Sequence, residues 1–385
     1  MEMFNVYPLF DVAPVKGEGM YLYDEKGTQY LDLYGGHAVI SIGHSHPYYV
    51  SKITEQLSKI GFYSNSVHIP QQQELATKLG ELSGYNDYQL FLCNSGAEAN
   101  ENALKLASFH NGKKKVIAFS QSFHGRTSLA VATTNDATIQ APINTNADIV
   151  FLPFNDKQAF IDAMDSDVCA VIIEGIQGVG GVNIPDSDFL QLLRVQCDLY
   201  GSVLILDEIQ SGYGRTGKFF AHQHANVKAD IITVAKGMGN GFPIGGVLIS
   251  PDFKPKYGML GTTFGGAYLA CAAGIAVLDV IKLEQLIENA TAMGNYLVES
   301  LQGIEGIKEI RSVGLMTGIE LNFAADSIRK KLLLKHHMFT GSASNKNTLR
   351  ILPSLTVSKI EIDLFVNALQ SSIKEYYNEA VSIGA

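Results

Sequence analysis

Two short apolar runs in the middle of the chain each end directly in a side chain that can carry a charge. Residues 203–206 (VLIL) are followed at once by Asp207, and residues 231–235 (IITVA) are followed by Lys236. Aliphatic runs of this length are typical of buried strands. In open α/β sheets the carboxyl ends of the strands form the edge where ligands bind. The pattern therefore predicts an acid and an amine at one ligand-binding edge of a buried sheet.

Apolar runs of the same kind alternate with helical segments over the first part of the chain. Strands are predicted at residues 89–93, 115–120, 149–152, 168–173 and 247–249, and helices at 47–60, 70–84, 188–200 and 268–283. This alternation predicts an α/β fold with a mainly parallel sheet covered by helices on both faces. The last of these strands, 247–249, is expected to close the sheet.

The pattern changes near residue 307. Short strands are predicted at residues 307–311, 318–321 and 349–352, followed by an amphipathic helix from 360 to about 376. These segments predict a smaller α+β domain, which an N-terminal hairpin can join. The expected division is residues 1–46 as an N-terminal segment joining the small domain, 47–266 as the large domain, and 267–385 as an interdomain helix with the small C-terminal domain.

Composition excludes several classes of protein. Hydrophobic residues make up 46% and charged residues 17%, as in ordinary globular enzymes. The net charge of −9 argues against a nucleic-acid-binding face. No apolar run is long enough to span a bilayer, and no signal peptide is recognisable. The four scattered cysteines predict free thiols in a reducing cytoplasm. Three N-terminal histidines, His37, His44 and His46, lie within ten residues, but no metal site is expected, because no cysteine or carboxylate lies at ligand spacing nearby.

Two further loops follow predicted strands and carry groups that could bind a ligand. Ser95, Gly96 and Ala97 lie between a strand and the start of a helix, where backbone N–H groups form a cradle for anions. Phe123 could stack on a flat ring, and Arg126 could bind a carboxylate through two hydrogen bonds. Each loop also has an ordinary explanation, as a common strand-to-helix turn or as a core phenylalanine beside a surface ion pair.

The acid and the lysine together suggest a cofactor. An enzyme of pyridoxal phosphate (PLP) needs a lysine that forms a Schiff base and an acid that pairs with the pyridinium nitrogen. The chain resembles the class III (subgroup II) PLP-dependent aminotransferases of fold type I, and within them the acetylornithine/succinylornithine aminotransferases of arginine metabolism. The resemblance covers nearly the whole chain and rests on segments 94–100, 123–127, 174–181, 207–210, 235–237, 262–266 and 349–353, in this order.

The resemblance implies a role for each matched residue. Lys236 would carry the cofactor and move the proton, and Asp207 would keep the pyridine nitrogen protonated. The other cofactor contacts would come from Ser95, Gly96 and Ala97 at the phosphate, Phe123 and Gln210 at the ring, and Thr263 of the partner subunit. The substrate would meet Arg126, Thr262, Glu174 and Arg350, the last of which would bind the α-carboxylate of glutamate or 2-oxoglutarate.

The implied reaction transfers the terminal (δ) amino group of N2-acetyl- or N2-succinyl-ornithine to 2-oxoglutarate, in a homodimer with shared active sites. Its products are the acylated glutamate semialdehyde and glutamate. The alternative within the family is another ω-aminotransferase that uses ornithine, 4-aminobutyrate or a lysine-type donor. Val179 departs from the family, which usually has an acidic residue there, and the segment 335–338 (KHHM) also differs from the usual apolar sequence.

Two interpretations other than an aminotransferase have less support in the sequence. The glycines at 237, 239 and 241 suggest a dinucleotide-binding dehydrogenase, but their spacing is not G-x-G-x-x-G and they come late in the chain. A PLP-type fold that serves only as a binding module is disfavoured, because Lys236 and Asp207 are both present.

Overall fold

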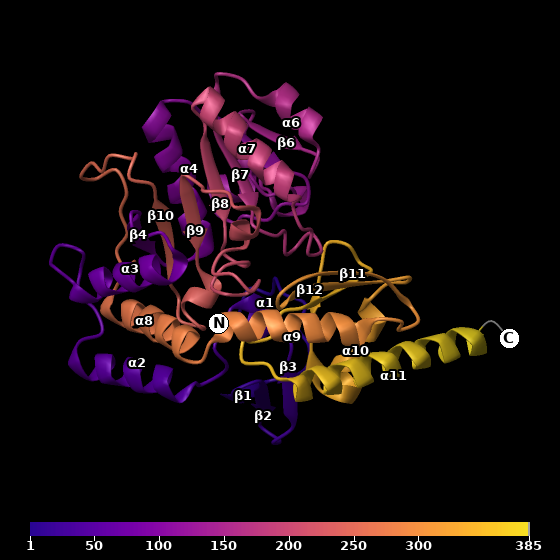
Figure 1. Cartoon of the computed structure of the whole chain (residues 1–385). Coiled ribbons are helices and arrows are strands. Elements are labelled where there is room, and N and C mark those ends of the chain that lie inside the picture. Colours follow the sequence, from indigo (N-terminus) through magenta and orange to yellow (C-terminus); the bar gives the residue numbers. More distant parts are fainter. Residues whose placement is uncertain (384–385) are drawn as a thin grey trace.

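The computed structural model describes residues 1–383, and its largest sheet contains the long apolar runs of the sequence. The seven strands lie in the order β4-β10-β9-β8-β7-β5-β6 (Figure 1). They are β4 (Gln89–Cys93), β5 (Lys115–Phe119), β6 (Ile149–Leu152), β7 (Val168–Glu174), β8 (Val203–Asp207), β9 (Ile231–Val234) and β10 (Gly245–Ile249). The pairs β9·β8, β8·β7, β7·β5 and β5·β6 are parallel, which confirms the predicted sheet.

Strand β10 lies inside the sheet and not at its edge, so the expectation that it closes the sheet is wrong. It pairs antiparallel with β9 on one side and with β4 on the other. A parallel return needs a connection of a dozen or more residues, and only residues 235–244 join β9 to β10. The short connection therefore makes β10 the antiparallel neighbour of β9.

Helices cover both faces of this sheet, as predicted. They include α3 (Pro70–Ser83), α4 (Gly96–Asn111), α5 (Ser128–Ala132), α6 (Lys157–Ala163), α7 (Ser187–Tyr200) and α8 (Tyr268–Leu283). In β8 the alternate residues Leu204 and Leu206 pack with α7, whereas Val203 and Ile205 pack with α4. Successive side chains of a strand point to opposite faces, so a strand buried on both sides reads as one continuous apolar run.

The remaining strands form two small sheets. The order β11-β12-β15-β14 joins β11 (Ile307–Val313), β12 (Met316–Leu321), β15 (Thr348–Ile351) and β14 (Gly341–Ser342). The order β1-β2-β3-β13 joins β1 (Pro14–Glu18), β2 (Tyr21–Asp24), β3 (Gln29–Asp32) and β13 (Met338–Phe339). The predicted N-terminal hairpin is therefore present, and its strand β3 pairs in parallel with a strand from the far end of the chain.

The other helices are α1 (Gly35–Ala38), α2 (Pro47–Lys59), α9 (Leu286–Leu301), α10 (Asp326–His336) and α11 (Lys359–Ile383). Helices α8 and α9 run end to end across the middle of the molecule (Figure 1). The sequence analysis missed α10, in which a few apolar residues stand among lysines. The unusual segment 335–338 is the end of α10, where His337 adopts a left-handed conformation (φ 55°), followed by the start of β13.

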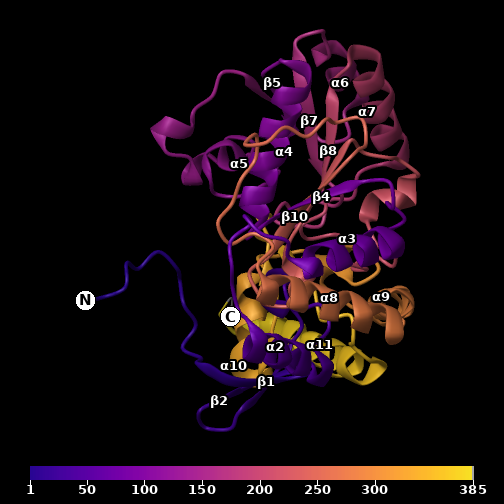
Figure 2. The ribbon, with the colours of Figure 1, turned by 90° about the vertical axis from the view of Figure 1, so that its left-hand side faces the viewer.

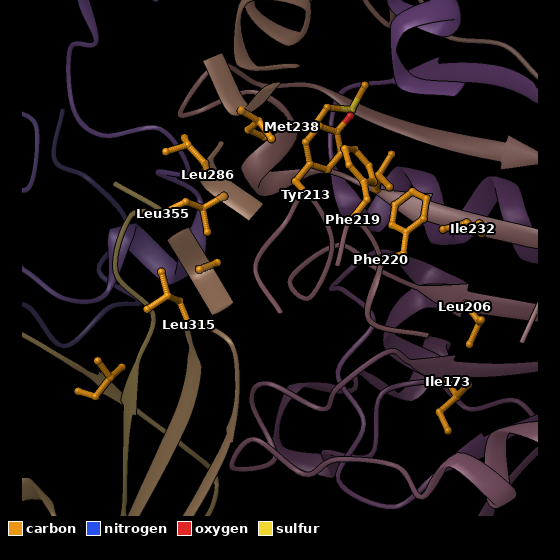
Figure 3. Packing of buried hydrophobic residues seen from close by; sticks show 14 of the residues in the cluster. Ile173, Leu206, Tyr213, Phe219, Phe220, Ile232, Met238, Leu286, Leu315 and Leu355 are labelled. Carbon is orange, nitrogen blue, oxygen red and sulfur yellow. The ribbon is translucent and has the colours of Figure 1, made fainter. Parts of the chain in front are cut away.

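An aromatic cluster connects the edge of the large sheet to the C-terminal strands. Tyr213 and Phe219 have ring centroids 5.0 Å apart, and Phe219 and Phe220 have theirs 4.9 Å apart. Figure 3 shows these rings between Leu206 and Ile232 on one side and Leu286, Leu315 and Leu355 on the other, all in one buried cluster. The loop that follows Asp207 is therefore held by packing from both parts of the chain.

The first 13 residues contain no helix or strand and extend away from the rest of the ribbon (Figure 2). Among the helices within residues 1–383, none has the length and apolar character needed to cross a membrane.

Candidate active site

Asp207 and Lys236 lie at the same edge of the large sheet. Asp207 is the last residue of β8, and Lys236 follows β9 by one residue after Ala235. A cavity of about 410 Å³ opens at this edge. Its lining comes from residues 94–97, 123–126, 235–236 and 241–244, together with Val39 and Ile209. The cavity therefore joins the predicted anion cradle, the Phe123 loop and the lysine.

The Asp207 carboxylate is fixed by a buried set of donors. Its Oδ2 atom lies 2.8 Å from His124 Nδ1 and accepts a hydrogen bond of 2.7 Å from Asn100 Nδ2. Its Oδ1 atom accepts from the Ile209 N–H at 3.0 Å. Thr233 in turn donates its hydroxyl to Asn100 Oδ1 at 2.7 Å. These contacts hold the carboxylate in one orientation at the end of its strand.

Sequence reasoning missed His124, Asn100 and Thr233 as parts of the site. His124 stands directly after Phe123, and Asn100 lies one turn into the helix that begins at Gly96, so both were inside the matched segments. The signal that could have found His124 is its place beside Phe123, the residue predicted to stack on the ring. Its Nε2 atom is buried and has no hydrogen-bond partner among the described residues.

Lys236 has an environment that favours its neutral amine. Burial lowers the pKa of Lys236 to about 8, although the carboxylates of Asp207 and Glu174 oppose this shift. Roughly a tenth of the amine is therefore neutral at pH 7, against less than a thousandth for an ordinary lysine. The backbone of Lys236 is left-handed (φ 41°), a conformation that costs a residue with a side chain energy and is concentrated at functional sites.

The cradle at the start of α4 has free donors for an anion. Ser95 is the N-cap, and its hydroxyl accepts from the Glu98 N–H at 3.2 Å. The N–H groups of Gly96 and Ala97 lie in the first turn, where the helix offers them no acceptor. A Cβ atom on Gly96 would come 2.8 Å from the Ile209 side chain, so a larger residue there would require Ile209 to move.

The backbone of Phe123 is hydrogen-bonded to the side chain of Glu174. The Phe123 N–H donates to Glu174 Oε1 at 2.9 Å, and the Gly178 N–H donates to Glu174 Oε2 at 3.1 Å. Burial raises the pKa of the Glu174 carboxyl to about 7, while His124 lowers it and Asp207 raises it further. Glu174 is therefore a buried carboxyl whose protonation changes near neutral pH.

The two arginines are placed differently. Arg350 is 4% exposed, and in the described part of the chain its side chain donates to Ser342, Gln210 and Tyr34 and to no carboxylate. Burial lowers the pKa of Arg350, whose charge also acts on Lys236. Arg126 is exposed at the cavity rim, and within residues 1–383 it makes no hydrogen bond or ion pair. Among the described residues, neither of these two arginines has an acidic partner; one shares the cavity lining with Lys236 and the other acts on it through its charge.

The remaining predicted residues lie outside the cavity lining. Gln210 donates to the carbonyl of His37 at 3.1 Å and accepts from Arg350 at 3.3 Å. Thr262 accepts from Asn94 Nδ2 at 3.2 Å, next to the first residue of the predicted anion loop. Thr263 is exposed and has no hydrogen-bond partner among the described residues.

Glu208, next to Asp207, is buried in a structural network. Its carboxylate accepts from the N–H groups of Ala221 (3.0 Å) and His222 (2.9 Å) and lies 2.7 Å from His222 Nδ1. The Tyr85 hydroxyl lies 2.6 Å from His222 Nε2. This network fixes the loop after β8 and gives Glu208 a structural place.

Within residues 1–383, no group of three or more histidine, cysteine or acidic side chains is arranged to hold a metal ion. His44 lies 2.9 Å from an Asp32 oxygen and His46 lies 2.9 Å from a Glu284 oxygen, which accounts for two of the N-terminal histidines.

Comparison with known proteins places the chain in a family. The family "Aminotransferase class-III" matches residues 5–373. The chain belongs to the class-III aminotransferases. It is 39% identical to the acetylornithine aminotransferase of Nitrosomonas europaea, over 98% of this chain and 99% of that protein, and 39% identical to that of Archaeoglobus fulgidus, over 95% and 97%. The predicted family and fold are thereby confirmed.

A solved structure with the same architecture is the ornithine aminotransferase of Toxoplasma gondii ME49. It has a TM-score of 0.90 and 28% identity, and the match covers 97% of this chain and 92% of that one. Members of this class use PLP, so the chain is a PLP-dependent transaminase that takes an amino donor and a keto acid. The residues present fit the cofactor: N–H groups that have no acceptor within residues 1–383 for a phosphate, a fixed carboxylate, and a buried amine of lowered pKa.

Proposed function

We propose that this class-III aminotransferase moves the δ-amino group of an N2-acylated ornithine, acetyl or succinyl, to 2-oxoglutarate. The observation that carries the proposal is the buried guanidinium of Arg350, which has no acidic partner among the described residues and whose charge acts on Lys236, while Arg126 lines the same cavity as Lys236. Two unpaired arginines favour substrates with two carboxylates, such as 2-oxoglutarate and glutamate. The acetylornithine aminotransferases that share 39% identity with the chain support the acylated donor.

The cofactor, when bound, supplies an electron sink for charge that develops on the substrate carbon. The residues of the chain do the rest. Asp207, oriented by His124 and Asn100, would hold a proton at the pyridine nitrogen, because an opposite charge in contact favours the protonated ring. Lys236 would move the proton at the substrate carbon through its Nζ atom, a role worth roughly 10²–10⁴-fold in rate.

The other predicted residues would bind and orient. The N–H groups of Gly96 and Ala97, at the N-terminus of α4 behind Ser95, would hold the phosphate, and Phe123 would stack on the ring. Gln210 would reach the ring oxygen once its contacts with His37 and Arg350 rearrange. Arg350 would bind the α-carboxylate of glutamate or 2-oxoglutarate, and Arg126 the other carboxylate.

The remaining substrate contacts would come from Glu174 and Thr262. The Glu174 carboxyl lies behind Phe123, and Thr262 would adjoin Arg126. The exposed Phe62 and Phe264, with ring centroids 5.1 Å apart, support a homodimer with shared active sites. Thr263 of the partner subunit would complete the phosphate site.

The chain would divide as the sequence predicts, into segments 1–46, 47–266 and 267–385. The sheet shared by β3 and β13 supports the assignment of the first segment to the small domain. We place the enzyme in the cytoplasm, and the four buried cysteines, all free thiols, support a reducing compartment.

A donor panel tests the proposed reaction. Steady-state kinetics with N2-acetylornithine, N2-succinylornithine, ornithine and 4-aminobutyrate, each with 2-oxoglutarate, should give the highest kcat/KM for one of the acylated donors. A higher value for ornithine or 4-aminobutyrate would assign the chain to another ω-aminotransferase. That outcome has some structural support, because Val179 supplies no acidic side chain at the loop after β7.

A further inference from the structure

The donors of Arg350 are partly used by neutral acceptors. Its Nε–H donates to the Ser342 carbonyl at 2.5 Å, Nη1 donates to Gln210 Oε1 at 3.3 Å, and Nη2 donates to the Tyr34 hydroxyl at 2.6 Å. A guanidinium has five N–H groups. One N–H therefore remains on each terminal nitrogen, which is the pair that a carboxylate binds with two parallel hydrogen bonds.

Tyr34 is held firmly at this position. The carboxylate Oδ1 of Asp32 accepts from the N–H groups of Tyr34 (3.0 Å) and Gly35 (2.8 Å), which anchors the turn after β3. The Arg350 guanidinium lies 5.4 Å from the centre of the Tyr34 ring. The phenol oxygen also lies 2.7 Å from His37 Nδ1, so the hydroxyl can donate to His37 while it accepts from Arg350.

Gly341 makes room for the ring. It lies opposite Arg350 in the pairing of β14 with β15. A Cβ atom at position 341 would come 2.0 Å from Cε2 of Tyr34, closer than any real contact. The tyrosine, the glycine and the arginine thus form one packed unit contributed by the two ends of the chain.

We propose that Tyr34 is a positioning residue that aims Arg350 at the carboxylate of the dicarboxylate substrate. Its hydroxyl takes one N–H of Nη2, and the substrate takes the other. Without the hydroxyl, the buried Nη2 group of Arg350 loses its acceptor. The guanidinium then rotates toward another acceptor and is no longer oriented to bind the substrate carboxylate. This inference rests on the proposed function only in that Arg350 receives 2-oxoglutarate or glutamate.

The direct test is binding of glutarate, a dicarboxylate without a keto group, to the PLP-loaded enzyme by calorimetry. Tyr34→Phe keeps the ring and removes the hydroxyl, and it should raise the Kd of glutarate about tenfold, as expected for one hydrogen bond to a charged group. Tyr30→Phe is the matched control, because the Tyr30 hydroxyl contacts Asp24 near the surface, 3.2 Å away. The control should bind glutarate as the wild type does.

Kinetics separate positioning from a general structural effect. In Tyr34→Phe the KM values of 2-oxoglutarate and glutamate should rise about tenfold, while kcat changes less than about threefold. Unchanged or tighter glutarate binding in Tyr34→Phe would overturn the proposal. Tighter binding would mean that the hydroxyl competes with the substrate for Arg350.

Gly341→Ala supplies a second test that leaves the hydroxyl in place. The added methyl group should displace the Tyr34 ring and weaken glutarate binding by a factor similar to that of Tyr34→Phe. In a Tyr34→Ala background the same change should alter the Kd less than about twofold, because the two residues act as a unit. Equal losses from Gly341→Ala in both backgrounds would contradict the proposal.

Because glutarate binding needs no amino donor, the result stands apart from the proposed reaction. If the enzyme does not use acylornithines but Tyr34→Phe weakens glutarate binding, the role of Tyr34 is supported and the proposed reaction is contradicted.

Discussion

His124 Nδ1 lies 2.8 Å from Asp207 Oδ2, and both side chains are almost completely buried. Asp207 is thereby tied to the loop that carries Phe123, so the acid proposed for the pyridine nitrogen and the residue proposed to stack on the ring are fixed together. Asn100 joins the same loop, because its amide also donates to the His124 carbonyl at 2.7 Å.

His124→Phe removes this contact and keeps a flat ring at the position. We expect kcat to fall about tenfold, the value of one hydrogen bond to a charged group, because Asp207 loses its orientation. The pH dependence of the absorbance of the bound cofactor should also shift, which a purely structural change would leave alone. His46→Gln, altered near the surface beside Glu284, is the control. A His124→Phe enzyme with wild-type kcat would show that the contact has no role in catalysis.

Lys236 leads to a prediction about pH. Since burial lowers its pKa to about 8, the neutral amine becomes abundant well below the range of an ordinary lysine near 10.4. The rate at which the cofactor-free enzyme takes up PLP should therefore rise with pH with a midpoint near 8. Stopped-flow absorbance measures this rate. A rate that keeps rising through pH 10 would contradict the assignment, and Lys236→Ala should take up no cofactor that borohydride can fix.

Glu174 links stability to pH. Its folded pKa of about 7 is above the value of 4.5 of a free carboxyl, so the native state binds more protons than the unfolded chain between these limits. The contribution of Glu174 to stability is therefore lost as pH rises from about 4.5 to 7. Relative to the wild type, Glu174→Gln should gain about 3 kcal/mol in unfolding free energy over this window. Urea unfolding at several pH values measures the difference, and a constant difference would refute the raised pKa.

The exposed side chains of Phe62 and Phe264 predict that this surface lies in the subunit interface of the proposed homodimer. Phe264 is 62% exposed and Phe62 is 43% exposed, although each is a large apolar side chain. Phe264→Asp should shift the sedimentation coefficient from that of a dimer to that of a monomer, since a buried charge without a partner is costly. Leu199→Asp is a matched change on α7, with 69% exposure in the wild type. Dissociation by the second variant alone would place the interface elsewhere.

The sequence allowed the sheet and its chemical edge to be predicted because both depend on local pattern. Asp207 and Lys236 each follow an aliphatic run. A strand that is buried on both faces consists of consecutive apolar residues, which are easily seen in the sequence. The place of β10 could not be predicted, since strand order depends on which connections fit between packed elements.

The contacts between site residues could not be predicted either, because the residues involved are far apart in sequence. Arg350 and Tyr34 are 316 positions apart in sequence and meet only because β3 pairs with β13 and β14 pairs with β15. His124 lay inside a matched segment, yet its role depends on Asp207 on another strand, 83 positions away. Long-range partners of this kind leave no periodic signal in a single sequence.

One measurement tests the proposed reaction most directly. The enzyme is incubated with 2-oxoglutarate and N2-acetylornithine or N2-succinylornithine carrying ¹⁵N at the δ position only, and the glutamate formed is analysed by mass spectrometry. The proposal predicts that glutamate made from at least one of the two donors carries the ¹⁵N label on its amino group. Unlabelled glutamate, or none from either donor, would contradict it.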